Sequence, residues 1–150
     1  MGIMRAVERR RNGEAIRAAI GFAASEAGDG VAYASLGRSE RGGRIVRVAF
    51  RCRPLAALRG RDVSYAAVEA VAAELRRQGL RGVEIAVDDE RLVADLAERL
   101  PLPAALSIPY VTLRCELNRF REATVVASDE PAVRDLTARA RAEAFLQAAA

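Results

Sequence analysis

The chain has no histidine, no tryptophan and no lysine among its 150 residues, and it has only two cysteines. Without histidine, Ser-His-Asp and Cys-His catalysis are excluded, and most kinds of zinc site are excluded as well. The side chains left for chemistry are therefore carboxylates, tyrosines, serines and the two thiols.

The two cysteines, Cys52 and Cys115, lie far apart and in no CxxC or similar spacing, so we expect two reduced thiols rather than a disulfide or a metal site. Long apolar runs are also missing, because no run approaches the roughly 18 residues that cross a bilayer. The start, MGIMRAVERRR, carries charge without a following apolar region. We therefore expect a cytoplasmic protein without membrane contact.

Composition and length indicate one ordinary globular domain, since 51% of the residues are hydrophobic and 29% are charged. We expect a basic and flexible segment over residues 1–14, a single domain over 15–145 and a frayed alanine-rich tail over 146–150. The charge is polarised along the chain. Residues 1–61 hold 13 arginines and 5 acids, whereas residues 62–150 hold 11 arginines and 15 acids. This indicates either a basic surface for an anionic partner or a basic flank without one.

The first sixty residues contain three segments of strand length, 15–25, 31–37 and 44–53, separated by glycine-rich turn signals. The third alternates most clearly. Its apolar side chains fall on one face, and the other face carries Arg47, Arg51 and Arg53. The first segment is ambiguous, because its alanines and isoleucines also suit a helix from about Val7 to Ala27.

The rest of the chain reads as helix, strand, helix, helix, strand and helix. The expected elements are a helix over about 64–78, a strand over 83–87, a helix capped by Asp88 or Asp89 with an apolar stripe reaching Leu100, a helix capped by Ser107 with Pro109 in its first turn, a strand over 123–127, and a helix with Pro131 near its start capped by Ser128 or Asp129. The expected order is βββαβααβα. Three antiparallel strands and two parallel ones reached by right-handed crossovers then make a five-stranded mixed α/β sheet with helices on both faces.

Residues 64–96, SYAAVEAVAAELRRQGLRGVEIAVDDERLVADL, resemble without a gap a region of bacterial ribonuclease H type 1 and of reverse-transcriptase-like domains. The likeness extends more weakly over about Ile16 to Ala144, and it implies the ribonuclease H-like fold. The residues that carry it are Tyr65, Gly79, Val83, Ile85, Asp88, Leu92, Val93 and Leu96.

The resemblance also implies a chemistry, because members of this family cleave the RNA strand of RNA–DNA hybrids with two metal ions held by four carboxylates. Asp88 matches the carboxylate that follows the family's strand. The family's glutamate before the tyrosine is Ser64 here, and residues 21–24, where an aspartate is expected, contain no acid. The aspartate of the last helix falls near Arg134, with Asp135 one residue away and so turned about 100° around the helix.

One carboxylate of four therefore matches, so we expect no metal site and no cofactor. Magnesium or manganese would be needed only if Glu26, Asp29 or Asp135 rebuilt the site. The acids Asp88, Asp89 and Glu90 are best interpreted as a helix start favoured by the helix dipole, with Asp88 as a remnant of the family's site; a working metal site is the alternative.

Three functions follow from the sequence. The first is a ribonuclease H-like domain without nuclease activity that binds RNA, DNA or a hybrid through Arg47, Arg51 and Arg53, or binds a protein partner or a second copy of itself. The second is an active metal-dependent hybrid nuclease with rearranged carboxylates. The third is a structural or dimerising domain, in which the arginine face is only the solvated side of an edge strand.

Overall fold

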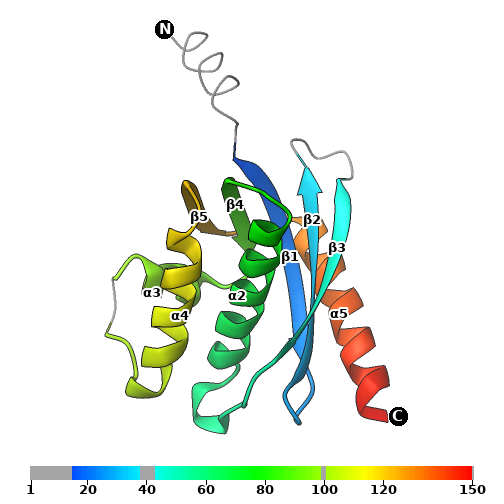
Figure 1. The fold of residues 1–150 in the computed structure, drawn as a ribbon. Helices are drawn as coiled ribbons and strands as arrows, with labels where there is room; N and C mark the ends of the chain where they lie inside the picture. The colour runs from blue at the N-terminus through cyan, green and yellow to red at the C-terminus, as the bar shows by residue number, and fades with distance from the viewer. Residues whose placement is uncertain (1–14, 38–42, 99–100, 150) are drawn as a thin grey trace, which may run out of the picture.

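The structure is a computed structural model that describes residues 15–37, 43–98 and 101–149. Within these ranges the expected order βββαβααβα is confirmed (Figure 1). The elements are β1 Ile16–Ala24, β2 Asp29–Gly37, β3 Arg44–Arg51, α2 Arg61–Arg77, β4 Gly82–Val87, α3 Glu90–Leu96, α4 Ser107–Asn118, β5 Glu122–Ala127 and α5 Pro131–Ala149, with short 3₁₀ turns at Ala56–Leu58 and Ala104–Leu106.

The five strands form one mixed sheet in the order β3-β2-β1-β4-β5. β1, β2 and β3 are antiparallel neighbours, whereas β4 pairs with β1 and β5 pairs with β4 in parallel. Each parallel strand is reached through a helical connection, which is the topology that the sequence predicts.

The ambiguous first segment is a strand and not a helix. β1 lies in the middle of the sheet, and its two faces are covered by α2 and α5. Ala18 and Ile20 face the core under α2, and Gly21 faces α5. A central strand that is buried on both faces needs no polar positions, which explains why its sequence alternates less clearly than that of β3.

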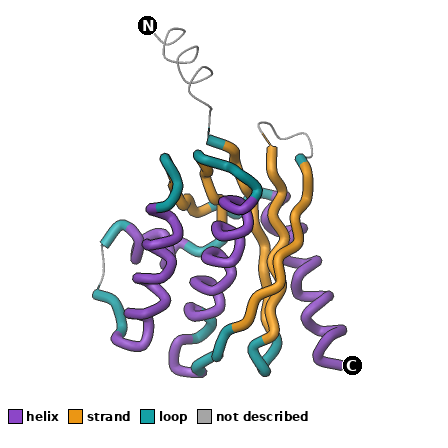
Figure 2. The backbone as a smooth tube through the Cα atoms, in the orientation of Figure 1, coloured by secondary structure: helices purple, strands orange, loops and turns teal. Residues whose placement is uncertain are grey.

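Two cores lie on the two faces of the sheet. The larger packs α2 and α4 against one face and contains Tyr65, Leu75 and Leu113 among many others. The smaller packs α5 against the other face through Val31, Tyr33, Leu136 and Ala140. Figure 2 shows the helices arranged around the five strands. The expectation of helices on both faces is therefore confirmed.

Several helix ends differ from their predicted positions. α2 begins at Arg61, three residues before the predicted start at position 64. The prediction that Ser107 caps α4 is wrong, because Ser107 is the first residue of that helix and follows directly on a 3₁₀ turn. The chain before α4 is already coiled, so no side-chain cap forms there. Pro109 lies in the first turn, as predicted.

The starts and ends of α3 and α5 can also be compared with the predictions. Asp89 caps α3 by accepting a hydrogen bond from the Leu92 N–H at 2.9 Å. The helix ends at Leu96, and position 100, to which its apolar stripe was expected to extend, lies outside the described residues. α5 begins at Pro131, but its first helical bond goes from the Arg134 N–H to the Glu130 carbonyl, so neither Ser128 nor Asp129 occupies the capping position.

Two predictions concern the ends of the chain, a frayed tail and a basic first segment. Residues 146–149, expected to fray, continue α5 to Ala149. The basic segment 1–14 lies outside the described residues. Within the described ranges, no helix combines the length and the apolar character needed to cross a membrane.

Candidate functional site

Asp88 lies at the end of β4, where its side chain is exposed. β4 runs parallel to β1, with Ala86 opposite Ala19. The pairing ends at Ala19 and Ala86, and the same register continued by two residues along both strands sets Asp88 level with Gly21. Glu84 and Ala86 belong to the face of β4 opposite the main core, and alternation continues that face to Asp88. The Ser128 N–H also donates to the carbonyl of Val87 at 2.9 Å, so the connection to α5 passes the same edge.

Gly21 is in direct contact with the backbone of α5. A Cβ atom at this position would lie 2.1 Å from the Thr137 nitrogen and 2.4 Å from the Leu136 carbonyl carbon. Real Cβ atoms essentially never come so close to other atoms. Because these neighbours are backbone atoms in the middle of a helix, they cannot yield by a rotamer change. Position 21 therefore has no room for any side chain.

Comparisons with known proteins bear on the fold. No family model and no curated protein matches the chain. The solved structures similar to it include the RNase H1 of Halobacterium salinarum NRC-1, with a TM-score of 0.64 and 15% identity over 88% of this chain and 98% of that one. The N-terminal RNase H domain of a Mycobacterium tuberculosis protein has a TM-score of 0.62 and 14% identity over 90% and 98%. LC11-RNase H1, solved in complex with an RNA/DNA hybrid, has a TM-score of 0.59 and 12% identity over 87% and 99%. The chain has the ribonuclease H-like fold.

The metal pair that the ribonuclease H-like fold suggests does not fit the residues present. Within residues 15–37, 43–98 and 101–149, no three carboxylates or thiols lie close enough together to hold a metal ion. Two divalent cations close together repel each other and stay bound only where several anionic oxygens converge. Asp88 and the closed position at Gly21 do not supply such a set.

The other acids weighed for this site lie elsewhere. Glu26 is in the turn after β1, and Asp29 opens β2 and pairs with Arg51 at 3.5 Å. Asp135 is exposed on α5. Ser64 is buried on α2, where its hydroxyl donates to the Gly60 carbonyl at 3.4 Å. The acids Asp88, Asp89 and Glu90 stay together as consecutive residues between β4 and the start of α3.

The predicted arginine face is present on β3, but part of its charge is neutralised. The Arg47 guanidinium donates to Glu143 of α5, with the Nε–Oε1 distance at 2.8 Å. Hydrogen bonds from Arg47 and from the Tyr33 hydroxyl lower the pKa of Glu143. Arg51 pairs only loosely with Asp29, and Arg53 is exposed just beyond the strand. Two of the three predicted arginines, Arg51 and Arg53, therefore remain open to an anionic partner.

Part of the charge that is polarised along the sequence is paired in space. Arg17 lies between Glu84 at 2.5 Å and Glu130 at 3.0 Å, and Arg61 pairs with Asp95 at 2.7 Å. Each pair joins an arginine of the first 61 residues to an acid of the remaining chain. The described residues hold 17 arginines and 17 acids, so the net positive charge is carried by positions 1–14, 38–42 and 99.

A buried polar cluster was missed by the sequence analysis. The Asp95 side chain is only 1% exposed and accepts hydrogen bonds from Arg61 at 2.7 Å and from the Tyr65 hydroxyl at 2.9 Å. Burial and the bond to Asp95 raise the pKa of Tyr65, so this phenol remains protonated and donates. The spacing held a signal, because Leu92, Asp95 and Leu96 fall on one helical face, which places an acid within the apolar stripe.

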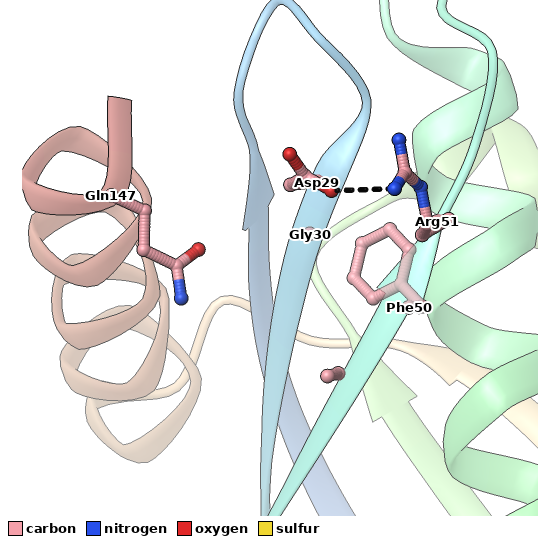
Figure 3. Close-up of a pocket in the computed structure, with 6 residues that line it drawn as sticks. Asp29, Gly30, Phe50, Arg51 and Gln147 are labelled. Carbon is pink, nitrogen blue, oxygen red and sulfur yellow. Dashed lines mark ion pairs between the residues drawn. The ribbon is translucent and has the colours of Figure 1, made fainter. Parts of the chain in front are cut away.

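Three hollows meet at Arg51, at the end of the edge strand. One of about 440 Å³ lies between β2, β3 and α5, and in Figure 3 Gln147 faces it from α5 while Arg51 pairs with Asp29 on the strands. A second of about 650 Å³ lies along Ala27, Arg51 and Arg53. The third, of about 300 Å³, we name the α2–α4 groove, and its lining includes Arg51, Arg53, Leu55, Glu69, Ile108 and Thr112.

Cys52 also lines the second hollow and the α2–α4 groove, but it is a poor nucleophile. Both cysteines are free, with Cys52 half-buried and Cys115 exposed. Burial, and secondarily the charge of Asp62, raises the pKa of the Cys52 thiol. Since the thiolate is the reactive form, this thiol is less reactive than a free cysteine at neutral pH.

Glu69 gives a pH-dependent prediction. Burial raises its pKa above the ordinary value of 4.5, and the nearby charge of Glu116 adds to the increase. The folded state therefore binds the proton more tightly than the unfolded state, and this residue costs stability as the pH rises through its folded pKa. We expect Glu69→Gln to melt at a higher temperature than the parent at pH 7 and at nearly the same temperature at pH 4. If thermal scans gave the variant and the parent the same melting temperature at pH 7 as well as at pH 4, this account would be contradicted.

Proposed function

We propose that this chain is a ribonuclease H-fold domain that does not cleave nucleic acid and acts by binding. The observation that carries the proposal is the contact of Gly21 with the α5 backbone beside Asp88. In this contact the helix occupies the space that a carboxylate side chain at position 21 would need.

Electrostatics supports the same conclusion. A single aspartate offers one negative charge to two cations of charge +2. Glu84, on the same face of β4 but four residues before Asp88, and Glu130 are already engaged by Arg17. Arg17 thus pairs with the other acid that β4 presents on this face of the sheet. A guanidinium held by two carboxylates is a stable arrangement that needs no metal.

The proposal is tested by incubating the chain with a labelled RNA–DNA hybrid in Mg²⁺ and in Mn²⁺. We expect no metal-dependent cleavage, and the parent and Asp88→Asn should be indistinguishable from the buffer blank. An active ribonuclease H1 in the same buffer is the positive control. Metal-dependent cutting that Asp88→Asn abolishes would show a working site and refute the proposal.

Binding of RNA, DNA or a hybrid without cleavage is a second candidate. It is favoured by the exposed Arg51 and Arg53 at the end of β3 and by the hybrid-bound state in which LC11-RNase H1 was solved. The equal numbers of arginines and acids in the described residues weigh against a strong phosphate site there. The binding experiment described below includes a hybrid and so separates this candidate from protein binding.

A further inference from the structure

The α2–α4 groove combines an apolar surface with water access. It runs between the segment after β3 and the helices α2 and α4. Leu58 is buried at its base, whereas Leu55 is 51% exposed and Ile108 is 80% exposed. Large aliphatic side chains with this much contact with water gain free energy when a partner covers them.

The charged side chains around the groove differ in how free they are to pair with a bound partner. Asp62 is turned inward, since its carboxylate accepts the Leu55 N–H at 2.7 Å and the Val63 N–H at 3.0 Å. Arg51 has a side chain that is 78% exposed, and its only ion-pair partner within the described ranges is Asp29 at 3.5 Å. Arg53 has no acidic partner among the described residues. Arg51 and Arg53 therefore set two exposed cations against the one half-buried carboxylate of Glu69.

We propose that the α2–α4 groove docks a short segment of a partner protein in which apolar side chains stand next to acidic ones. The apolar side chains cover Leu55 and Ile108, and the acids pair with Arg51 and Arg53. This inference rests on the proposed binding role and adds the class of partner. It does not depend on the outcome of the cleavage assay, because a protein can bind a segment here whether or not it cuts hybrids elsewhere.

The lining favours a protein segment over a nucleic acid. No aromatic side chain lines the groove, so bases have no surface on which to stack. Ile108 and Leu55 offer nothing to phosphates but match the aliphatic anchors of a docked peptide.

The test uses the full chain, immobilised and exposed to a displayed library of random twelve-residue peptides. We expect enrichment of peptides that combine leucine, isoleucine, phenylalanine or methionine with aspartate or glutamate. The best peptide is then synthesised, and its affinity is measured by fluorescence anisotropy. Enrichment of basic peptides, or no enrichment, would overturn the proposal.

Paired variants locate the binding surface. Ile108→Asp places an acid in the first turn of α4, where the helix dipole favours it, and is expected to weaken the peptide at least tenfold. The matched control is Val111→Asp, on the same helix and 57% exposed but outside the groove lining, which should change affinity less than twofold. Arg53→Glu should also weaken binding at least tenfold, whereas Arg141→Glu, exposed on α5 across the sheet, should not.

A labelled RNA–DNA hybrid is titrated in parallel at low and high salt. Hybrid binding that falls steeply with salt, is lost in Arg53→Glu and is unaffected by Ile108→Asp would identify a nucleic-acid surface and overturn the peptide proposal. Peptide binding that Ile108→Asp and Arg53→Glu both weaken, with both controls unchanged, supports it. Circular dichroism melts of the four variants show that each is folded.

Discussion

Replacing Gly21 by alanine is expected to destabilise the protein by about 3 kcal/mol or more, an effect at the upper end for a single added methyl group. The new Cβ would lie 2.1 Å from the Thr137 nitrogen and 2.4 Å from the Leu136 carbonyl carbon. Relief requires α5 to move off β1 and β2, which would open the core of Val31, Tyr33, Leu136 and Ala140. Urea unfolding of the parent and the variant measures the difference.

Gly82 provides the matched control, because it is also a strand glycine. A Cβ at Gly82 would meet the Ala15 Cα at 3.3 Å and the Ala15 Cβ at 3.6 Å, a close contact that small shifts can relieve. Gly82→Ala should therefore stay within about 1 kcal/mol of the parent. Gly21→Asp, which would restore an acid beside Asp88, should unfold the chain rather than create activity. A folded Gly21→Ala of parental stability would refute the close packing and weaken the proposed loss of nuclease chemistry.

Breaking the ion pair between Arg61 and Asp95 has the second largest expected effect. The Arg61 side chain is 15% exposed and the Asp95 side chain 1% exposed, so the pair is nearly dry. Arg61→Leu leaves the Asp95 carboxylate buried with only the Tyr65 hydroxyl as a partner, and one Asp95 oxygen, Oδ1, already has none. We expect a loss of about 3 kcal/mol, because an unpaired buried charge costs far more than the pair contributes.

A double-mutant cycle checks this reasoning. Arg61→Leu combined with Asp95→Leu removes both charges and should recover much of the stability lost in Arg61→Leu alone. Tyr65→Phe, which removes one hydrogen bond to Asp95 and leaves the ion pair, should cost only about 1 kcal/mol. Additive losses for the two leucine substitutions would mean that Arg61 and Asp95 do not interact in solution.

Much of the fold was predictable because it depends on local patterns. The alternation of Val46, Val48 and Phe50 fixes which face of β3 is buried, and the glycines and prolines mark where elements stop. The ends of helices were less predictable. Ser107 has the chemistry of a cap, but the 3₁₀ turn before it already satisfies the start of α4. A cap depends on how the preceding chain enters the helix, which residue type alone does not specify.

The candidate site was predictable in its one surviving residue but not in its surroundings. The position of Asp88 after a strand followed from the alternation Val83, Ile85, Val87. The neutralisation of Arg47 did not follow from the sequence, because its partner Glu143 is 96 residues away on α5. The burial of Asp95 on α3 was signalled only by its spacing along that helix. Its pairing with Arg61 did not follow from the sequence, because Arg61 is 34 residues earlier and belongs to α2.

The amino-acid sequence by itself determined the chemical inventory of this protein: no histidine, a serine at position 64, the acids Asp88 to Glu90 after β4, and the order of strands and helices. These are properties of residue identity and of short-range periodicity. Only the tertiary structure decided that α5 lies against Gly21 and that Arg17, Arg47 and Arg61 pair with acids from the rest of the chain. Contacts and Coulomb energies depend on distances in space, and these are set by how the two faces of the sheet are covered.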